Sequence, residues 1–234
     1  MKTHQIMKRL LGLTLAATAG LSLVSAAAAA PLRIRGTVVA ISSNALTVHT
    51  AKGDVSASLK DDTAFVSVVP SDLSHVETGS YVGVASKNAD DKLIALSVIV
   101  FPPSLKGASE GHAAYDVLPD TTLSRGARTA SSMTNANVKA IATPQSVPDV
   151  NSTMTNGSVA TATASGDVRL LTVTYNGGEQ NILVPPTAPI VAFVPGAASI
   201  VTPGAAVFVN ADETDGTITA GLVAVGSHDL TPPF

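Results

Sequence analysis

From residue 31 onward, hydrophobic positions recur with a period of two rather than 3.6. Leu46 and Val48 occupy alternate positions in one run, and Val82 and Val84 do so in another. Short runs rich in Val, Ile and Thr are separated by turn-forming clusters of Gly, Asn, Asp and Pro, such as 52–54. This alternation is typical of half-buried β-strands, and the regular spacing of the turns is typical of a barrel or sandwich. We therefore predict an all-β fold.

The strand pattern occurs twice in the chain, at an offset of 125 residues. Between 46 and 100, 16 of 55 positions are identical to the residue found 125 positions later, without a gap. The matches include turn residues as well as valines, for example Gly79 with Gly204 and Asp90 with Asp215. Chance matches in a Val-rich chain would not also align the turns, so we interpret the pattern as a duplication. We predict two tandem small β-barrels of about six strands each.

Two shared features indicate what each copy requires. Gly79 and Gly204 each precede a strand, which indicates a positive φ or a position without room for a Cβ. The last strand also changes phase at the same place in both copies, between Ala95 and Val98 and between Ala220 and Val223. One extra residue at this point predicts a β-bulge, which helps a sheet to curve into a barrel.

The first thirty residues have the layout of a secretory signal peptide. Lys2, Lys8 and Arg9 precede an apolar run from 10 to 24, and alanines at 26–30 offer cleavage positions. The run of about fifteen residues is shorter than the roughly 20 that span a bilayer. We expect cleavage after Ala28 or Ala29 and a periplasmic or secreted protein.

Composition excludes several kinds of site. The chain has no Cys and no Trp, and its eight aromatic residues are three Tyr and five Phe. Disulfides, cysteine metal sites and thiol nucleophiles are therefore excluded, and aromatic platforms for nucleic acid are improbable. Loss of three cations with the signal peptide changes the net charge from −3 to −6. An acidic chain is a poor match for nucleic acid, and no further 18-residue apolar stretch would span a membrane.

The segment between the two copies has a different character. Residues 103–152 are polar and show little periodicity, which favours either a linker or an ordered strand or arm. Within the segment, 133–138 resembles 154–159, so a spare strand could cover an edge of a sheet. We match Gly36-Thr37-Val38 of the first copy with Gly157-Ser158-Val159 as the first strand of the second copy.

Several stretches resemble an uncharacterised family of secreted proteobacterial proteins. They include Gly107-x-x-Glu110-Gly111-His112-x-x-Tyr115-Asp116, Thr153-Met154-Thr155-Asn156-Gly157, Tyr175-x-Gly177-Gly178-Glu179, Val184-Pro185-Pro186 and Phe193-Val194-Pro195-Gly196. The first copy resembles small secreted β-barrels that carry only a domain-of-unknown-function label. The resemblance covers most of residues 31–234 and implies an OB-like barrel fold, but no established activity.

Members of the family are often named "metal ABC transporter permease" by automated annotation. That name conflicts with a mature chain that has no transmembrane helix, because a permease needs several. The family usually has Trp where this chain has Tyr115, which weakens the case for this residue as an aromatic anchor for a ligand.

One cluster of residues is a candidate for ligand or partner contact. Glu110, His112, Tyr115 and Asp116 lie within seven residues and suit either a partial metal site or polar contacts at a barrel mouth. A second group, Asp72, His75 and Glu77, has no counterpart in the second copy, which favours a solvated loop. Asp61-Asp62 is interpreted as a surface turn, because neighbouring residues on a strand point to opposite faces.

No catalytic motif is present in the sequence, and we expect neither enzymatic activity nor a cofactor. The predicted organisation is a signal peptide (1–30), an OB-like barrel (31–102), a long, mostly irregular segment (103–152) and a second OB-like barrel (153–234). We predict a periplasmic binding or structural protein that acts on a protein or an envelope component. The alternative is an accessory protein of a transport system that binds a small ligand or a metal.

Overall fold

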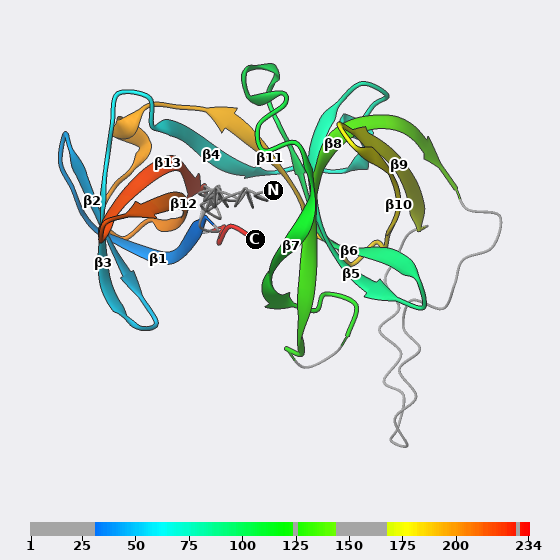
Figure 1. The fold of residues 1–234 in the computed structure, drawn as a ribbon, viewed down its shortest axis with the longest axis horizontal. Helices are drawn as coiled ribbons and strands as arrows, with labels where there is room; N and C mark the ends of the chain where they lie inside the picture. The colour runs from blue at the N-terminus through cyan, green and yellow to red at the C-terminus, as the bar shows by residue number, and fades with distance from the viewer. Residues whose placement is uncertain (1–30, 124–125, 144–167, 228–229) are drawn as a thin grey trace, which may run out of the picture.

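The computed structural model describes residues 31–123, 126–143, 168–227 and 230–234, and its fold is all-β (Figure 1). These residues form a continuous 13-stranded sheet together with three short 3₁₀ turns. None of the described helical turns has the length and apolar character needed to cross a membrane. The predicted all-β fold is confirmed, whereas the predicted signal peptide lies outside the described residues.

The first barrel consists of five strands. They are β1 (Leu32–Ile41), β2 (Ala45–Thr50), β3 (Gly53–Ser58), β12 (Ala206–Thr214) and β13 (Thr217–Gly226). The order β13–β12–β1–β2–β3 is antiparallel, and a parallel contact between Ser58 and Thr219 closes the ring. The interior is apolar, since Val48, Val209 and Val223 are at most 1% exposed. The alternating pattern places these valines on the inner face.

The second barrel has the same construction. Its strands are β5 (Tyr81–Ala89), β6 (Lys92–Val100), β8 (Arg128–Ala142), β9 (Arg169–Tyr175) and β10 (Gly178–Val184). The order β6–β5–β8–β9–β10 is antiparallel, and β10 pairs with β6 in parallel at Ile182 and Leu93 to close the ring. Val82, Val98 and Leu171 are fully buried inside it.

The two barrels exchange their last hairpins. The hairpin β5–β6 follows the first copy in sequence but completes the second barrel, and β12–β13 completes the first barrel. Between the barrels run β4 (Ala64–Pro70) and β11 (Ile190–Pro195), which pair with each other and connect the two rings (Figure 1). Two tandem barrels, each closed by its own copy, are therefore not confirmed, because each barrel takes strands from both copies.

The structure bears out the features that the two copies share. Gly79 and Gly204 have φ of +91° and +88°, and a Cβ at either residue would meet no atom within 4 Å. The backbone conformation, and not a clash, is therefore what favours glycine. The register shifts so that Leu96 and Gly221 are each the extra residue of a bulge, at equivalent positions. The predicted bulge is confirmed in both copies.

The middle segment is more ordered than a mostly irregular connection. It contains the 3₁₀ turn Pro103–Leu105, the strand β7 (Gly111–Pro119) and the long strand β8. β8 pairs with β5 and β9 just as β1 pairs with β12 and β2, so Val138 occupies the place of Val38. The expectation of mostly irregular structure is wrong, as is the barrel boundary at residue 153, because the sequence resembling 154–159 is itself the first strand. Residues 154–159 lie outside the described residues.

Candidate functional site

A third apolar core fills the space between the two barrels, which we call the seam. It combines residues of both barrels with β4 and β11, among them Val68, Ile99 and Ala224. Five aromatic rings form a chain through this core: Tyr81, Phe101, Phe193, Phe234 and Phe208, with successive centroids 5.4, 5.2, 5.6 and 5.1 Å apart. These separations are those of favourable ring contacts. The few aromatic residues are therefore concentrated where the barrels meet.

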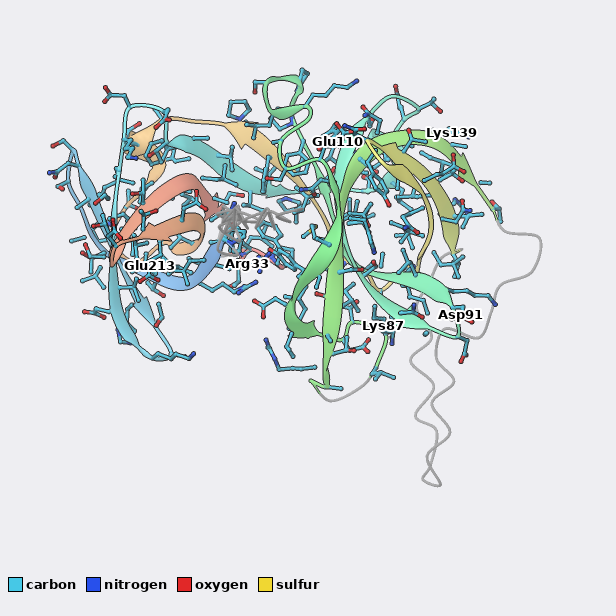
Figure 2. All side chains as sticks on the ribbon, in the orientation of Figure 1. Arg33, Lys87, Asp91, Glu110, Lys139 and Glu213 are labelled. Atoms are coloured by element: carbon cyan, nitrogen blue, oxygen red, sulfur yellow. The ribbon has the colours of Figure 1, made fainter. Side chains whose placement is uncertain are left out.

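β7 belongs to the second barrel but also contacts the first. On β1, Ile34 points into its own barrel, so its neighbours Arg33 and Arg35 point outward toward the seam. Arg33 Nη1 donates to the Tyr115 carbonyl oxygen at 2.9 Å, and the guanidinium lies 4.1 Å from the centroid of the Tyr115 ring. Arg35 Nη1 lies 2.7 Å from Asp116 Oδ2. Figure 2 shows Arg33 between the two barrels.

These contacts set the charge states at the seam. Burial raises the pKa of the Tyr115 hydroxyl and outweighs the opposite influence of Arg35 and Arg33. Burial also raises the pKa of Asp116, but the Val117 N–H and Arg35 lower it by more, so its pKa lies below the ordinary value. Near neutral pH, Tyr115 is therefore uncharged and Asp116 is an anion that neutralises one arginine.

The structure divides the predicted cluster of four residues into two pairs. Tyr115 and Asp116 lie at the seam, whereas Glu110 and His112 face the second barrel. Glu110 accepts the Asn176 N–H at 2.9 Å, and His112 Nδ1 lies 2.8 Å from Thr134 Oγ1. Figure 2 places Glu110 at the edge of the second barrel, away from Arg33. No group of three or more His, Asp or Glu suited to a metal occurs among the described residues.

The other acidic candidates have local contacts. Asp72 Oδ1 accepts the Ser74 N–H at 2.7 Å, caps a 3₁₀ turn and lies 3.4 Å from His75 Nδ1. The Ser74 hydroxyl and N–H lower the pKa of Asp72. Asp61 and Asp62 form an exposed turn, as predicted. Each of these groups is solvent-exposed.

A pocket of about 350 Å³ opens at the seam. We call it the seam pocket, and its lining is Arg35, Leu96, Leu118, Pro119, Thr121, Arg128, Pro189, Thr231, Pro232, Pro233 and Phe234. The volume is at the small end of the range for ligand sites, and the mostly apolar wall with a few polar groups is typical of them. Both copies, the segment between them and residues 231–234 contribute to the wall.

Arg35 is the most constrained polar group in the seam pocket. Its Nε donates to the Phe234 carbonyl oxygen at 2.6 Å, and Nη1 is paired with Asp116. Its Nη2 is buried and has no hydrogen-bond partner among the described residues. A guanidinium has five donors, and leaving one of them buried without an acceptor is unfavourable.

An ion pair secures the loop that forms one side of the seam pocket. Lys87 Nζ lies 2.8 Å from Asp120 Oδ2, and the two side chains are 12% and 2% exposed. Thr122 donates to Asp120 through its hydroxyl and its N–H, and Thr121 Oγ1 donates to the Leu96 carbonyl at 3.1 Å. The loop is thereby held against the β5–β6 hairpin. Burial raises the pKa of Asp120, but the bonds from Lys87 and Thr122 lower it by more.

Sequence reasoning identified Tyr115 and Asp116 but missed the arginines opposite them. One signal was present, because Arg33 and Arg35 occupy alternate positions in a predicted strand and flank a buried residue. Their partners lie 82 residues away for Arg33 and 199 residues away for Arg35. Such long-range contacts become visible only in the folded chain.

In comparisons with known proteins, the chain matches no family model, no curated protein and no solved structure at the level required to indicate homology.

Proposed function

We propose that the protein is an exported binding protein without catalytic activity, and that its site is the seam pocket. The observation that carries this proposal is Arg35 Nη2, a buried donor without a partner beside an open, largely apolar pocket. Export rests on the signal-peptide pattern of residues 1–30, which favours a periplasmic or secreted location. A small-ligand role corresponds to the alternative that the sequence left open.

The polar contacts of the described histidines support a role without catalysis. His49 pairs with Asp54 at 2.7 Å on an exposed hairpin, His75 lies beside the capping Asp72, and His112 bonds Thr134. Each of these contacts stabilises a turn or a strand. None of these three histidines lines the seam pocket.

A protein or envelope component is the second candidate ligand, and β7 favours it. This strand pairs only with β8 among the described strands, and it carries exposed Ala113, Ala114 and Val117. Val117 is 48% exposed, an unusual position for a large apolar side chain. A strand with one unpaired edge and an apolar face can bind an extended segment of a partner.

A fragment screen by ligand-observed NMR on residues 31–234 tests the proposed function. Thr231 lies at the exposed rim of the seam pocket, so Thr231→Trp should fill the pocket and abolish binding. Thr217→Trp, on the exposed turn between β12 and β13, is the matched control and should retain binding. Fragments that bind both variants equally would place the site elsewhere.

Site-specific photo-crosslinking in the cell envelope tests the second candidate. A photoreactive residue at Val117 should give a discrete adduct, whereas one at Val39, 45% exposed on the first barrel, should not. Equal labelling from both positions would contradict a role for β7.

A further inference from the structure

We infer that the seam pocket takes a small monovalent carboxylate with an apolar body, whose carboxylate accepts from Arg35. This inference rests on the proposed function and names the ligand class. Arg35 already bonds the Phe234 carbonyl through Nε and Asp116 through Nη1, which fixes the guanidinium in one orientation. Nη2 is then presented, buried and without a partner, in the wall of the pocket. A carboxylate oxygen is the acceptor that suits such a donor best.

The charges of the lining favour one negative charge on the ligand. Asp116 neutralises Arg35, so this pair contributes no net charge. Arg128 also lines the seam pocket, and its guanidinium donates to the Val117 carbonyl oxygen, with no carboxylate partner among the described residues. Arg33 does not line the pocket, because its guanidinium lies over the Tyr115 ring. The lining therefore carries one uncompensated positive charge, which complements a carboxylate better than a phosphate dianion.

The rest of the wall defines the body of the ligand. Leu96, Leu118, Pro189, Pro232 and Phe234 provide an apolar surface, and the hydroxyls of Thr121 and Thr231 are the only other side-chain polar groups in the lining besides the two arginines. A cavity of about 150 Å³ holds one benzene molecule, so 350 Å³ suits a ligand of roughly ten non-hydrogen atoms. An aliphatic or aromatic monocarboxylate of this size satisfies both the charge and the shape.

Isothermal titration calorimetry with three matched probes on residues 31–234 tests the inference. Octanoate has the required charge and size, octanamide is its neutral isostere, and octyl phosphate carries a second charge. We expect octanoate to bind at least about tenfold more tightly than octanamide, since a hydrogen bond between two charged groups is stronger than one to a neutral amide. We also expect octyl phosphate to bind no more tightly than octanoate.

Variants assign the effect to the arginines. Arg35→Gln and Arg128→Gln should each weaken octanoate binding while leaving octanamide binding within about twofold, and Arg128, which is exposed, serves if the Arg35 variant does not fold. Arg33→Gln, outside the pocket, should change neither affinity by more than about twofold. Equal binding of octanoate and octanamide, or tighter binding of octyl phosphate, would overturn the inference and leave the proposed function intact. If none of the probes binds and the fragment screen is also negative, both fail.

Discussion

Val68 on β4 lies opposite Phe193 on β11, and the two residues occupy the same position in the two copies. On either side of this pair, Val66 lies opposite Pro195 and Pro70 lies opposite Val191, so the register is symmetric about the centre. A pseudo-twofold axis therefore passes between Val68 and Phe193. The exchanged hairpins follow from this symmetry, because each copy gives the other what it receives.

Phe193 tests whether the seam makes the two barrels one cooperative unit. It is 4% exposed and contacts Phe101 and Phe234 in the ring chain. Phe193→Ala should cost about 3–5 kcal/mol, because it leaves a cavity in a core shared by both barrels. Urea denaturation should show one transition at lower urea for both wild type and variant. Two separate transitions, with only one of them shifted, would show that the barrels fold independently.

The positive φ of Gly79 predicts a backbone penalty. Gly79→Ala should destabilise the fold by about 1–2 kcal/mol, because an L-residue is strained at this conformation. Gly221→Ala is the control, since Gly221 has no positive φ and the nearest atom to an added Cβ would be 3.7 Å away. Thermal unfolding of both variants measures the difference. Equal melting temperatures would remove the conformational explanation.

The Lys87–Asp120 pair should contribute far more than a surface pair. Asp120→Ala leaves the ammonium of Lys87 buried without its partner and should cost about 3–5 kcal/mol. Glu179→Ala breaks the exposed pair with Lys139, at 2.7 Å, and should cost less than about 1 kcal/mol. Urea unfolding of the two variants gives both values, and similar losses would contradict the role given to burial.

The same pair predicts how stability depends on acid. The pKa of Asp120 is lowered in the folded state from its ordinary value of 3.8, so its stabilisation is complete above that value and is lost as the pH falls through the folded pKa. The free energy of unfolding should therefore decrease between about pH 5 and pH 3. Asp120→Asn should flatten this decrease. An unchanged slope in the variant would assign the acid sensitivity to other carboxyl groups.

Local features of the fold could be predicted from the sequence, and long-range pairing could not. The bulges at Leu96 and Gly221 and the glycine conformation at Gly79 appear in the phase and spacing of residues close in sequence. The exchange of hairpins does not, because β5 and β12 are equivalent strands and either one suits the edge of β1. The alternation also predicts that both will be half-buried, whichever barrel they join.

The candidate site shows the same limit. Tyr115 and Asp116 stood out as neighbours of Glu110 and His112, but sequence proximity grouped residues that β7 directs to two different barrels. Their partners, Arg33 and Arg35, come from β1, and Phe234 comes from the far end of the described chain. The seam pocket depends on the hairpin exchange and was therefore not accessible to local reasoning.

Disulfide formation in double-cysteine variants tests the hairpin exchange most directly, because the natural chain has no cysteine. Ser86 on β5 lies opposite Ser132 on β8, with hydroxyl oxygens 3.2 Å apart, so Ser86→Cys with Ser132→Cys should crosslink within one chain. In a tandem arrangement Ser86 would instead lie opposite Leu32, as its counterpart Ala211 does here. We expect a disulfide, seen by mass spectrometry of the monomer, in the Ser86/Ser132 variant and none in Leu32→Cys with Ser86→Cys. The reverse result would contradict the exchange, and with it the seam and its pocket.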